Sequence, residues 1–336
     1  MIRLLGALLA AAAAALLAAC GNAGSTAPSV AYAGQPTPTP TPFNGHLYVE
    51  YAPKIGDASA SGIGVYALPL SPSSTPLFVI PQNVGPLAFD PHGNMFTSLQ
   101  DAIAEFTFPF SASSAPVTVI SRGSQTIPQY VSDIGFDGNG NLWAQTSSDV
   151  RDFVPPIGPN SVAQTIVSGA TLSQLIFSPS GTMYSGNSAL HFGATDTIRI
   201  YKFYPYTAPP TTIASAQFGI PIGFYPDGTI LISSTGANVI EPPGTIAPPG
   251  LEIVNSISST TMVQYIVPFT VTNQATLAHF GAIDQAGTTY VLDGARNNAL
   301  EVYAYPMGPG SAPGFHIQCV PAPGACLPPV GVYLGP

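Results

Sequence analysis

Positive charge is scarce in this chain of 336 residues, which holds seven Lys and Arg residues against sixteen Asp and Glu residues. Charged residues make up 7% of the sequence, and the formal net charge is −9. A protein that binds nucleic acid needs a basic surface to neutralise phosphates, and seven scattered cations cannot form one. Nucleic acid is therefore excluded as a partner. A surface of uncharged polar residues also keeps its properties over a wide pH range, which suggests an acidic external habitat as a hypothesis.

Helical periodicity is missing as well, beyond residue 20. The 37 prolines and 34 glycines instead separate short β-branched and aromatic runs at regular intervals. Proline and glycine placed in this way mark turns between strands. The composition therefore predicts one large all-β domain after the N-terminal segments.

One eight-residue pattern recurs along the chain. Its first full copy is Phe89-Asp90-Pro91-His92-Gly93-Asn94-Met95-Phe96, and further copies occupy 136–143, 177–184, 224–231 and, more loosely, 283–290. Each copy reads as a strand, a tight turn closed by glycine, and a strand with a large apolar residue three positions later, which is a β-hairpin. The turn glycines recur every 41 to 59 residues, near the period of four-stranded propeller blades; they are Gly45, Gly93, Gly140, Gly181, Gly228 and Gly287.

Two more strands follow each hairpin. The third strand usually ends in proline, as in 65–69, 105–109, 201–205 and 302–306, and a short β-branched strand closes the unit. Four strands in each of six units predict a six-bladed β-propeller of antiparallel blades. The first unit lacks an innermost strand, and pairing of Val330–Leu334 with the Gly45 hairpin would close the ring and remove its open edges. An open sandwich array and a β-solenoid are the alternatives.

The first 20 residues read as a signal peptide. Arg3 precedes a wholly apolar stretch, Leu4–Ala19, which is too short and too rich in alanine for a comfortable membrane span. The stretch ends Leu17-Ala18-Ala19-Cys20-Gly21, which resembles the cleavage box of bacterial lipoproteins. We expect lipidation of Cys20 and anchoring to the membrane through several acyl chains. The alternative is an ordinary secretory signal with an incidental cysteine.

The signal peptide sets the expected domain organisation and location. Residues 21–42 are rich in Pro, Thr, Ser and Gly and predict a flexible tether. Residues 43–336 form the propeller domain, which we expect to be a monomer. The protein is expected in the bacterial cell envelope, on the outer side of the cytoplasmic membrane or on the outer membrane. Because export exposes thiols to oxidation, Cys319 and Cys326 are expected to form a disulfide; a metal site would need more ligands than His316 supplies.

Polar side chains are expected around the mouth of the central channel, where inner strands begin and second strands end. They could hold a small polar ligand or a divalent cation, Ca or Mg, through oxygen ligands, and a histidine with a carboxylate could act as acid and base. The alternative is that they only satisfy buried backbone ends and channel water. These candidates are Glu50, Asp133, Gln145, Gln174, Asn187, His279 and Asp293.

Three further features bear on binding. The segment Asp137-Gly138-Asn139-Gly140-Asn141 looks like a calcium loop, but its alignment with the other turns favours a hairpin turn. Two connections between second and third strands are long, 52–61 and 234–250. In propellers such loops share a face with the loops that join blades, and long loops are often functional. The alternative is that these long loops are neutral insertions, which a surface position tolerates.

Several of these units resemble known repeats. Residues 87–96 and 290–303 resemble NHL-type repeats, and Ile103-Ala104-Glu105-Phe106-Thr107-Phe108-Pro109 looks like the repeat of streptogramin lyases. The resemblance spans 43–336 and implies a six-bladed propeller of the superfamily that also holds gluconolactonase-like hydrolases. Those enzymes bind a divalent metal in the central channel through acidic and amide side chains.

Three functions remain open from the sequence. The first is a non-enzymatic, lipid-anchored propeller that binds or scaffolds a protein or an envelope glycan on the face bearing the 234–250 loop. The second is a metal-dependent lactonase-like hydrolase, or a lyase, with its site at the channel mouth. The third is a purely structural envelope protein. Fold alone does not decide between them.

Overall fold

The repeated turn-and-strand units fold into β-sheets. A computed structural model of the chain describes residues 45–51, 61–82, 85–99, 102–121, 131–146, 149–168, 172–178, 181–187, 198–201, 211–213, 220–234, 250–254, 263–268, 281–293, 299–317, 320–322, 325–327 and 329–336. Within this part of the chain there is no helix of the length and apolar character that crossing a membrane would need.

Six four-stranded antiparallel sheets and one two-stranded hairpin form within the described residues. Five sheets follow chain order from the inner to the outer strand. The first sheet contains β26 (Pro329–Gly335), β1 (His46–Tyr51), β2 (Gly62–Ala67) and β3 (Phe78–Ile80). The second contains β4 (Leu87–Phe89), β5 (Met95–Leu99), β6 (Ala102–Phe106) and β7 (Val117–Ser121). The third contains β8 (Val131–Phe136), β9 (Leu142–Thr146), β10 (Asp149–Phe153) and β11 (Ala163–Ser168).

The remaining strands complete three more sheets and the hairpin. The fourth sheet contains β12 (Leu172–Phe177), β13 (Met183–Asn187), β14 (Ile198–Tyr201) and β15 (Thr211–Ile213). The fifth contains β16 (Ile220–Phe224), β17 (Ile230–Ser234), β18 (Gly250–Val254) and β19 (Val263–Pro268). The sixth contains β20 (Gly281–Ile283), β21 (Thr289–Asp293), β22 (Ala299–Tyr303) and β23 (Phe315–Ile317). The hairpin, which the sequence did not predict, pairs β24 (Val320–Ala322) with β25 (Ala325–Leu327).

The first sheet joins the two ends of the propeller sequence. β26 pairs antiparallel with β1, and this register sets Tyr333 opposite Tyr48 and Val332 opposite Val49. A bulge interrupts the pairing between Glu50 and Tyr51. The innermost strand of this sheet therefore comes from the far end of the chain.

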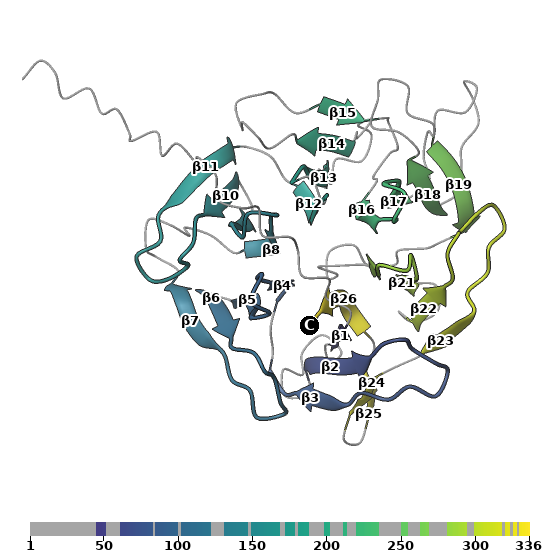
Figure 1. Ribbon diagram of the computed structural model, residues 1–336, viewed down its shortest axis with the longest axis horizontal. Coiled ribbons are helices and arrows are strands. Elements are labelled where there is room, and N and C mark those ends of the chain that lie inside the picture. The colour runs from purple at the N-terminus through teal and green to yellow at the C-terminus, as the bar shows by residue number, and fades with distance from the viewer. Residues whose placement is uncertain are drawn as a thin grey trace, which may run out of the picture. The chain divides into compact units, whose positions relative to one another are not determined.

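The inner strands of neighbouring sheets contact one another around a common centre (Figure 1). Contacts join β4 to β8, β8 to β12, β12 to β16, β16 to β20, β20 to β26 and β26 to β4. The expected all-β propeller of four-stranded antiparallel blades is confirmed. Each blade is then covered on both faces by its neighbours, which explains why strands such as β1 are buried at nearly every position.

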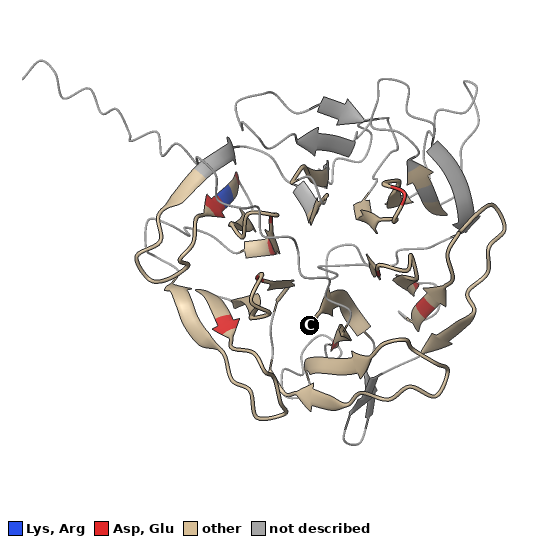
Figure 2. Ribbon diagram, in the orientation of Figure 1, with Lys and Arg blue, Asp and Glu red and all other residues tan. Residues whose placement is uncertain are grey.

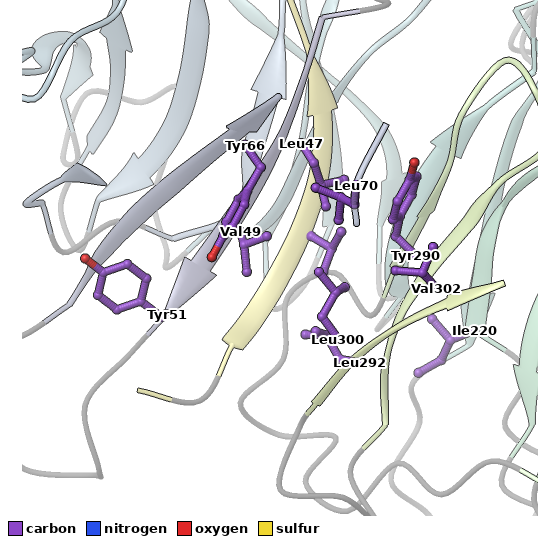
Figure 3. Close-up of a cluster of buried hydrophobic side chains, with 11 residues drawn as sticks. Leu47, Val49, Tyr51, Tyr66, Leu70, Ile220, Tyr290, Leu292, Leu300 and Val302 are labelled. Carbon is purple, nitrogen blue, oxygen red and sulfur yellow. The ribbon is translucent and has the colours of Figure 1, made fainter. Parts of the chain in front are cut away.

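Alternate residues of β1 fill two different inter-sheet cores, because successive side chains point to opposite faces of a strand. Leu47, Val49 and Tyr51 belong to a cluster with Tyr290 and Leu292 of β21, in the sixth sheet (Figure 3). Tyr48 belongs to a different cluster, which contains residues of the second sheet. Each of these fully buried side chains contributes roughly 1.5–3 kcal/mol through removal of apolar surface from water. The cores that hold the ring together therefore lie between blades.

The large residue three positions after each turn glycine reaches the next blade. Phe96 packs on Phe136 with ring centroids 5.1 Å apart, and Tyr184 packs on Phe224 at 5.0 Å. Tyr48 with Phe89 and Trp143 with Phe177 form the same contact at 4.6 and 6.0 Å. The repeated sequence pattern thus encodes a chain of aromatic contacts from blade to blade, and each contact adds about 0.5–1.5 kcal/mol to its buried area.

The hairpin turns are held by their own side chains. Asp137 Oδ1 accepts hydrogen bonds from the backbone N–H groups of Asn139 and Asn141, at 2.8 and 3.0 Å. Its Oδ2 accepts bonds from Asn141 Nδ2 and from Trp143 Nε1, at 2.9 and 3.1 Å. Gly140 has a φ of +80°, a conformation that residues with a side chain rarely adopt. The hairpin-turn interpretation of this segment is confirmed, since the carboxylate is occupied by N–H donors.

Candidate functional site

Two of the residues expected at the channel mouth, Glu50 and Asp133, lie near Tyr333, which was not among the candidates. Tyr333 of β26 donates a hydrogen bond from its phenol to Oε2 of Glu50 in β1, at 3.3 Å. Both side chains are buried, with 5% and 8% of their surface exposed. Asp133 of β8 lies close enough to influence the phenol, since its charge raises the pKa of Tyr333. Groups from the first and third sheets therefore meet where the inner strands converge.

A glycine makes room for this contact. A Cβ atom on Gly331 would lie 2.8 Å from the Tyr333 phenol oxygen and 2.9 Å from Oε2 of Glu50. Real Cβ atoms are almost never found so near other heavy atoms. Gly331 stands directly opposite Glu50 in the β1–β26 pairing. Because Gly331 has no side chain, the Glu50 carboxyl and the Tyr333 phenol can both lie close to the backbone at this position.

Burial controls the ionisation of both groups. Removal from water raises the pKa of Glu50 to about 8, and the hydrogen bond from Tyr333 opposes part of that rise. Burial also raises the pKa of Tyr333 well above its ordinary value, and the Glu50 and Asp133 carboxyls add to the rise. At neutral pH both partners are therefore protonated. A protonated carboxyl can donate a proton to a substrate only if the substrate reaches it, and this one is covered.

Asp133 connects two blades. Its Oδ2 accepts a hydrogen bond from the backbone N–H of Leu175 in β12, the inner strand of the fourth sheet. Its Oδ1 accepts one from the N–H of Ile134, at 2.9 Å. Only 2% of Asp133 is exposed. Both carboxylate oxygens are thus engaged by backbone donors, in the role expected of a residue that satisfies buried backbone ends.

The other predicted channel residues are placed in part. Gln145, Gln174 and Asp293 are buried, in β9, β12 and β21, and Gln145 stands opposite Asp133 in the β8–β9 pairing. The side chain of Asn187 and the whole of His279 lie outside the described residues. Among the residues that the structure describes, no group of three or more His, Cys, Asp or Glu side chains is placed to hold a metal ion. Glu50 and Asp133 are the carboxyls that could contribute oxygen ligands near Tyr333.

Charged groups are thinly scattered over the described chain (Figure 2). Arg151 of β10 pairs with Asp149, with Nη2 to Oδ2 and Nε to Oδ1 distances of 2.8 and 2.9 Å. The bond from Arg151 lowers the pKa of Asp149, with burial working in the opposite direction. Thr146 also donates to Asp149 Oδ1, at 2.7 Å. These bonds link the end of β9 to the start of β10, and the charges of Arg151 and Asp149 neutralise each other.

A second repeated turn escaped the sequence reading. In the loop between the third and fourth strands of four sheets, a serine hydroxyl accepts a hydrogen bond from the backbone N–H of the residue three positions earlier. The donor and acceptor pairs are Ser71–Ser74, Ser111–Ser114, Gly158–Ser161 and Gly308–Ser311, at 2.8, 2.8, 2.8 and 2.9 Å. Each loop follows a cis peptide bond to proline; these bonds are Leu68–Pro69, Phe108–Pro109, Pro155–Pro156 and Tyr305–Pro306. In all four loops a serine follows the cis proline by five residues, and this recurrence was the signal that the sequence offered.

Other predicted positions lie elsewhere. His92 and Asp227 are exposed in their hairpin turns. Cys20 and Cys319 lie outside the described residues, as does the side chain of Cys326, whose backbone belongs to β25. The connections 52–60 and 235–249 also lie outside them. Lipidation, the disulfide and the loop face therefore stay predictions.

No protein-family model matches the chain, and no curated protein matches it. Solved structures do. A protein of unknown function from Bacteroides caccae has 11% identity and a TM-score of 0.50, over 86% of this chain and 98% of that one. A protein from Lactobacillus plantarum has 10% identity and a TM-score of 0.50, over 81% and 82% of the two chains. A gluconolactonase from Xanthomonas campestris has 10% identity and a TM-score of 0.49, over 79% and 86%.

At such identities the likeness shows the fold alone. The chain also spans about a third, 31% and 30%, of two extracellular-domain structures from B. thetaiotaomicron. The four-stranded sheets and the contacts between their inner strands define this protein as a β-propeller.

Proposed function

We propose that the protein is an exported, lipid-anchored β-propeller that acts as a binding or scaffolding module for a protein or an envelope glycan. The observation that carries the proposal is the use of the channel carboxyls. Asp133 is engaged by the N–H groups of Leu175 and Ile134, and Glu50 by the phenol of Tyr333. The carboxyls that would do chemistry in an enzyme here hold strands in place: Asp133 joins the third and fourth sheets, and Glu50 is bonded to Tyr333 within the first sheet. The loops are then the parts left to carry function.

We infer that the six sheets form one six-bladed ring. Three observations support this architecture: the count of four-stranded sheets, the cycle of contacts between inner strands, and the pairing of β26 with β1. A closed ring has no open sheet edge at its ends and offers rigid support for loops. The NHL-like character of the repeats fits the same architecture.

Export and anchoring rest on the first 42 residues. The sequence Leu17-Ala18-Ala19-Cys20 supports cleavage before Cys20 and acylation of its sulfur. The Pro-Thr repeat within 35–42 would hold the propeller away from the membrane surface. A disulfide between Cys319 and Cys326 would suit the same oxidising compartment. The proposed location is the outer side of the cytoplasmic membrane or the outer membrane.

One observation favours a second function. Glu50 and Asp133 both lie near Tyr333, and two carboxyls near a channel could hold a divalent cation such as Ca or Mg. A metal-dependent lactonase-like hydrolase, or a lyase, would use such a site. The covering of Glu50 by Tyr333 makes this the less favoured proposal.

The binding function is tested on the face bearing the loop between β17 and β18. The full chain and a variant with residues 235–249 replaced by a short Gly-Ser linker are used to capture partners from envelope fractions. We expect the variant to lose at least one partner that the wild type retains. Ser113→Ala is the matched control, because Ser113 is exposed in a loop between third and fourth strands. Identical capture by all three proteins, or lactone hydrolysis that depends on Glu50, would overturn the proposal.

A further inference from the structure

The residue before each cis proline lies against the hairpin turn of its own blade. Leu68 donates its backbone N–H to the carbonyl of Gly45, at 3.3 Å. Phe108 donates its own to Oδ1 of Asn94, at 3.1 Å. Tyr305 lies against Gly287, where an added Cβ would come within 2.6 Å of the Tyr305 Cγ. Among the described residues, four of the six sheets carry a residue before a cis proline, and in two of them, at Phe108 and Tyr305, this residue is aromatic and exposed.

The Tyr305 side chain is held by packing contacts and a hydrogen bond, and part of it is still exposed to solvent. Its ring centroid lies 5.2 Å from that of the buried Tyr225, and the turn backbone at Gly287 supports it from below. Its phenol donates a hydrogen bond to Oδ2 of Asp227 in the turn of the neighbouring blade, at 3.1 Å. Nevertheless 39% of Tyr305 remains exposed. The ring is therefore pre-oriented, with an exposed carboxylate at its edge.

Asp227 is held as an acceptor at that edge. Its Oδ1 accepts bonds from the backbone N–H and the hydroxyl of Thr229, at 2.9 and 2.7 Å. Asp227 is exposed, and its Oδ2 takes the single bond from Tyr305 in this contact. A carboxylate oxygen can accept two hydrogen bonds. A ligand lying on the Tyr305 ring could therefore donate a hydroxyl to Asp227 Oδ2.

Phe108 repeats the arrangement in the second blade. It is 46% exposed, and its ring meets Phe110 edge-on with centroids 5.5 Å apart. Gly93 lies beside it, with an added Cβ 3.7 Å from the Phe108 Cγ. Pro109 and Pro306, next to the two aromatic residues, are exposed as well. Two rigid aromatic platforms thus stand on separate blades of one face.

We propose that Tyr305 and Phe108 are stacking platforms for the sugar rings of an uncharged glycan, with Asp227 accepting a sugar hydroxyl. The apolar C–H face of a pyranose ring has the size of one aromatic ring, and its hydroxyls suit a carboxylate acceptor. A polymer with repeating sugars could engage both platforms, and this would multiply weak single contacts. The inference rests on the proposed binding function and adds to it a glycan site on the hairpin-turn face, away from the strand ends Ser234 and Gly250.

Size and charge favour a glycan over the other candidate partners. Each platform offers a single exposed ring, whereas a specific protein interface needs about 20–30 residues on each side. A proline-rich peptide needs a groove between neighbouring aromatic rings, and among the described residues the ring that lies beside Tyr305 is the buried one of Tyr225. The net charge of −9 repels anionic polymers. None of these three arguments, on interface size, groove shape or charge, counts against an uncharged polysaccharide.

The test is native affinity electrophoresis of the full chain in gels cast with soluble neutral polysaccharides: dextran, mixed-linkage β-glucan, galactomannan and xylan. We expect at least one to retard the wild type. Tyr305→Ala and Phe108→Ala should each weaken binding roughly tenfold, because each removes one stacked ring. Tyr305→Phe keeps the ring and should stay within about threefold of the wild type. Val162→Ala, at a 77% exposed aliphatic residue before β11, is the matched control and should bind normally.

Folding of each variant is checked by its thermal unfolding midpoint, and Phe108→Ala keeps the test valid if Tyr305→Ala is unstable. Absence of retardation by all four polysaccharides would overturn the proposal. Equal retardation of the Tyr305→Ala, Phe108→Ala double variant and the wild type would overturn it too. Binding of a proline-rich peptide that Tyr305→Ala abolishes would replace the glycan with a peptide. The capture experiment on the 235–249 loop is independent, so the general binding function can survive failure here.

Discussion

Tyr333 and Glu50, which are 283 positions apart in the sequence, form a hydrogen bond of 3.3 Å at the centre of the propeller. The contact joins β26, from the end of the chain, to β1, from its beginning. Both side chains are buried, and Gly331 provides the space that they share. The bond links the proposed closure of the ring to the residues first considered for catalysis.

Glu50→Gln is expected to flatten the pH dependence of stability. Burial raises the folded-state pKa of Glu50 from an ordinary value of 4.5 to about 8. Because the folded value is the higher one, the stabilising effect is complete below about pH 4.5 and is lost as the pH rises through about 8. The loss should reach on the order of 4 kcal/mol in the free energy of unfolding.

Urea unfolding of wild type and Glu50→Gln between pH 4 and pH 9 measures this effect. In the variant, the slope of the free energy of unfolding against pH should be smaller than in the wild type but not zero, because burial also raises the pKa of Glu105 and Asp152. An unchanged slope in the variant would show that Glu50 does not ionise in this range. Greater stability in acid would also agree with the acidic habitat suggested by the uncharged surface.

Gly331→Ala should destabilise the protein. The new Cβ would lie 2.8 Å from the Tyr333 phenol oxygen and 2.9 Å from Glu50 Oε2, so the buried pair would have to move. Overpacking of this kind costs typically about 1–3 kcal/mol. Gly138→Ala is the control, since no atom lies within 4 Å of a Cβ at that half-buried turn position. Denaturant midpoints of the two variants give the comparison, and equal midpoints would contradict the crowding at Gly331.

Asp133→Asn should weaken the junction between the third and fourth sheets. Both carboxylate oxygens accept backbone N–H groups, from Leu175 and Ile134, and an amide offers only one acceptor. The other N–H would face an NH₂ group, at a cost of roughly 1–3 kcal/mol. Unfolding is measured with and without added calcium. A loss of stability that appears only when calcium is present would instead assign Asp133 to a metal site.

Cys20→Ala should release the protein from the membrane. Acylation of the Cys20 sulfur and of the new N-terminal amine is the expected anchor, and its removal leaves no comparable apolar attachment. Labelling of cells with radioactive palmitate, followed by fractionation, shows whether label and membrane association disappear together. If the variant stays in the membrane fraction without label, the N-terminal segment is retained as a different kind of anchor.

Local sequence signals account for much of the fold. The turn glycines, such as Gly93 and Gly140, mark hairpins because their backbone conformation excludes most other residues. The strand that pairs with β1 was also predicted, because an alternating apolar run remained unused at 330–334. The β24–β25 hairpin was not predicted, since its strands have three residues each and show no clear alternation.

The candidate site was harder to predict. The sequence placed Glu50 at the end of a second strand and Asp133 near the start of an inner strand, and the structure shows both buried, in β1 and β8. Their partners were not foreseen, because Tyr333 and Leu175 are brought to them only by the register and the packing of whole blades. The exposed platform at Tyr305 was missed for the same reason, as its support comes from Gly287 and from Asp227 of another blade.

The metal content of the purified protein, measured by mass spectrometry after dialysis without chelator, separates the binding module from the metal-dependent enzyme. We expect well under about one divalent ion per chain, because Asp133 and Glu50 are engaged by protein donors and not by a cation. One retained calcium, magnesium, zinc or manganese ion per chain, lost in Asp133→Asn or Asp293→Asn, would contradict this and favour the hydrolase or lyase.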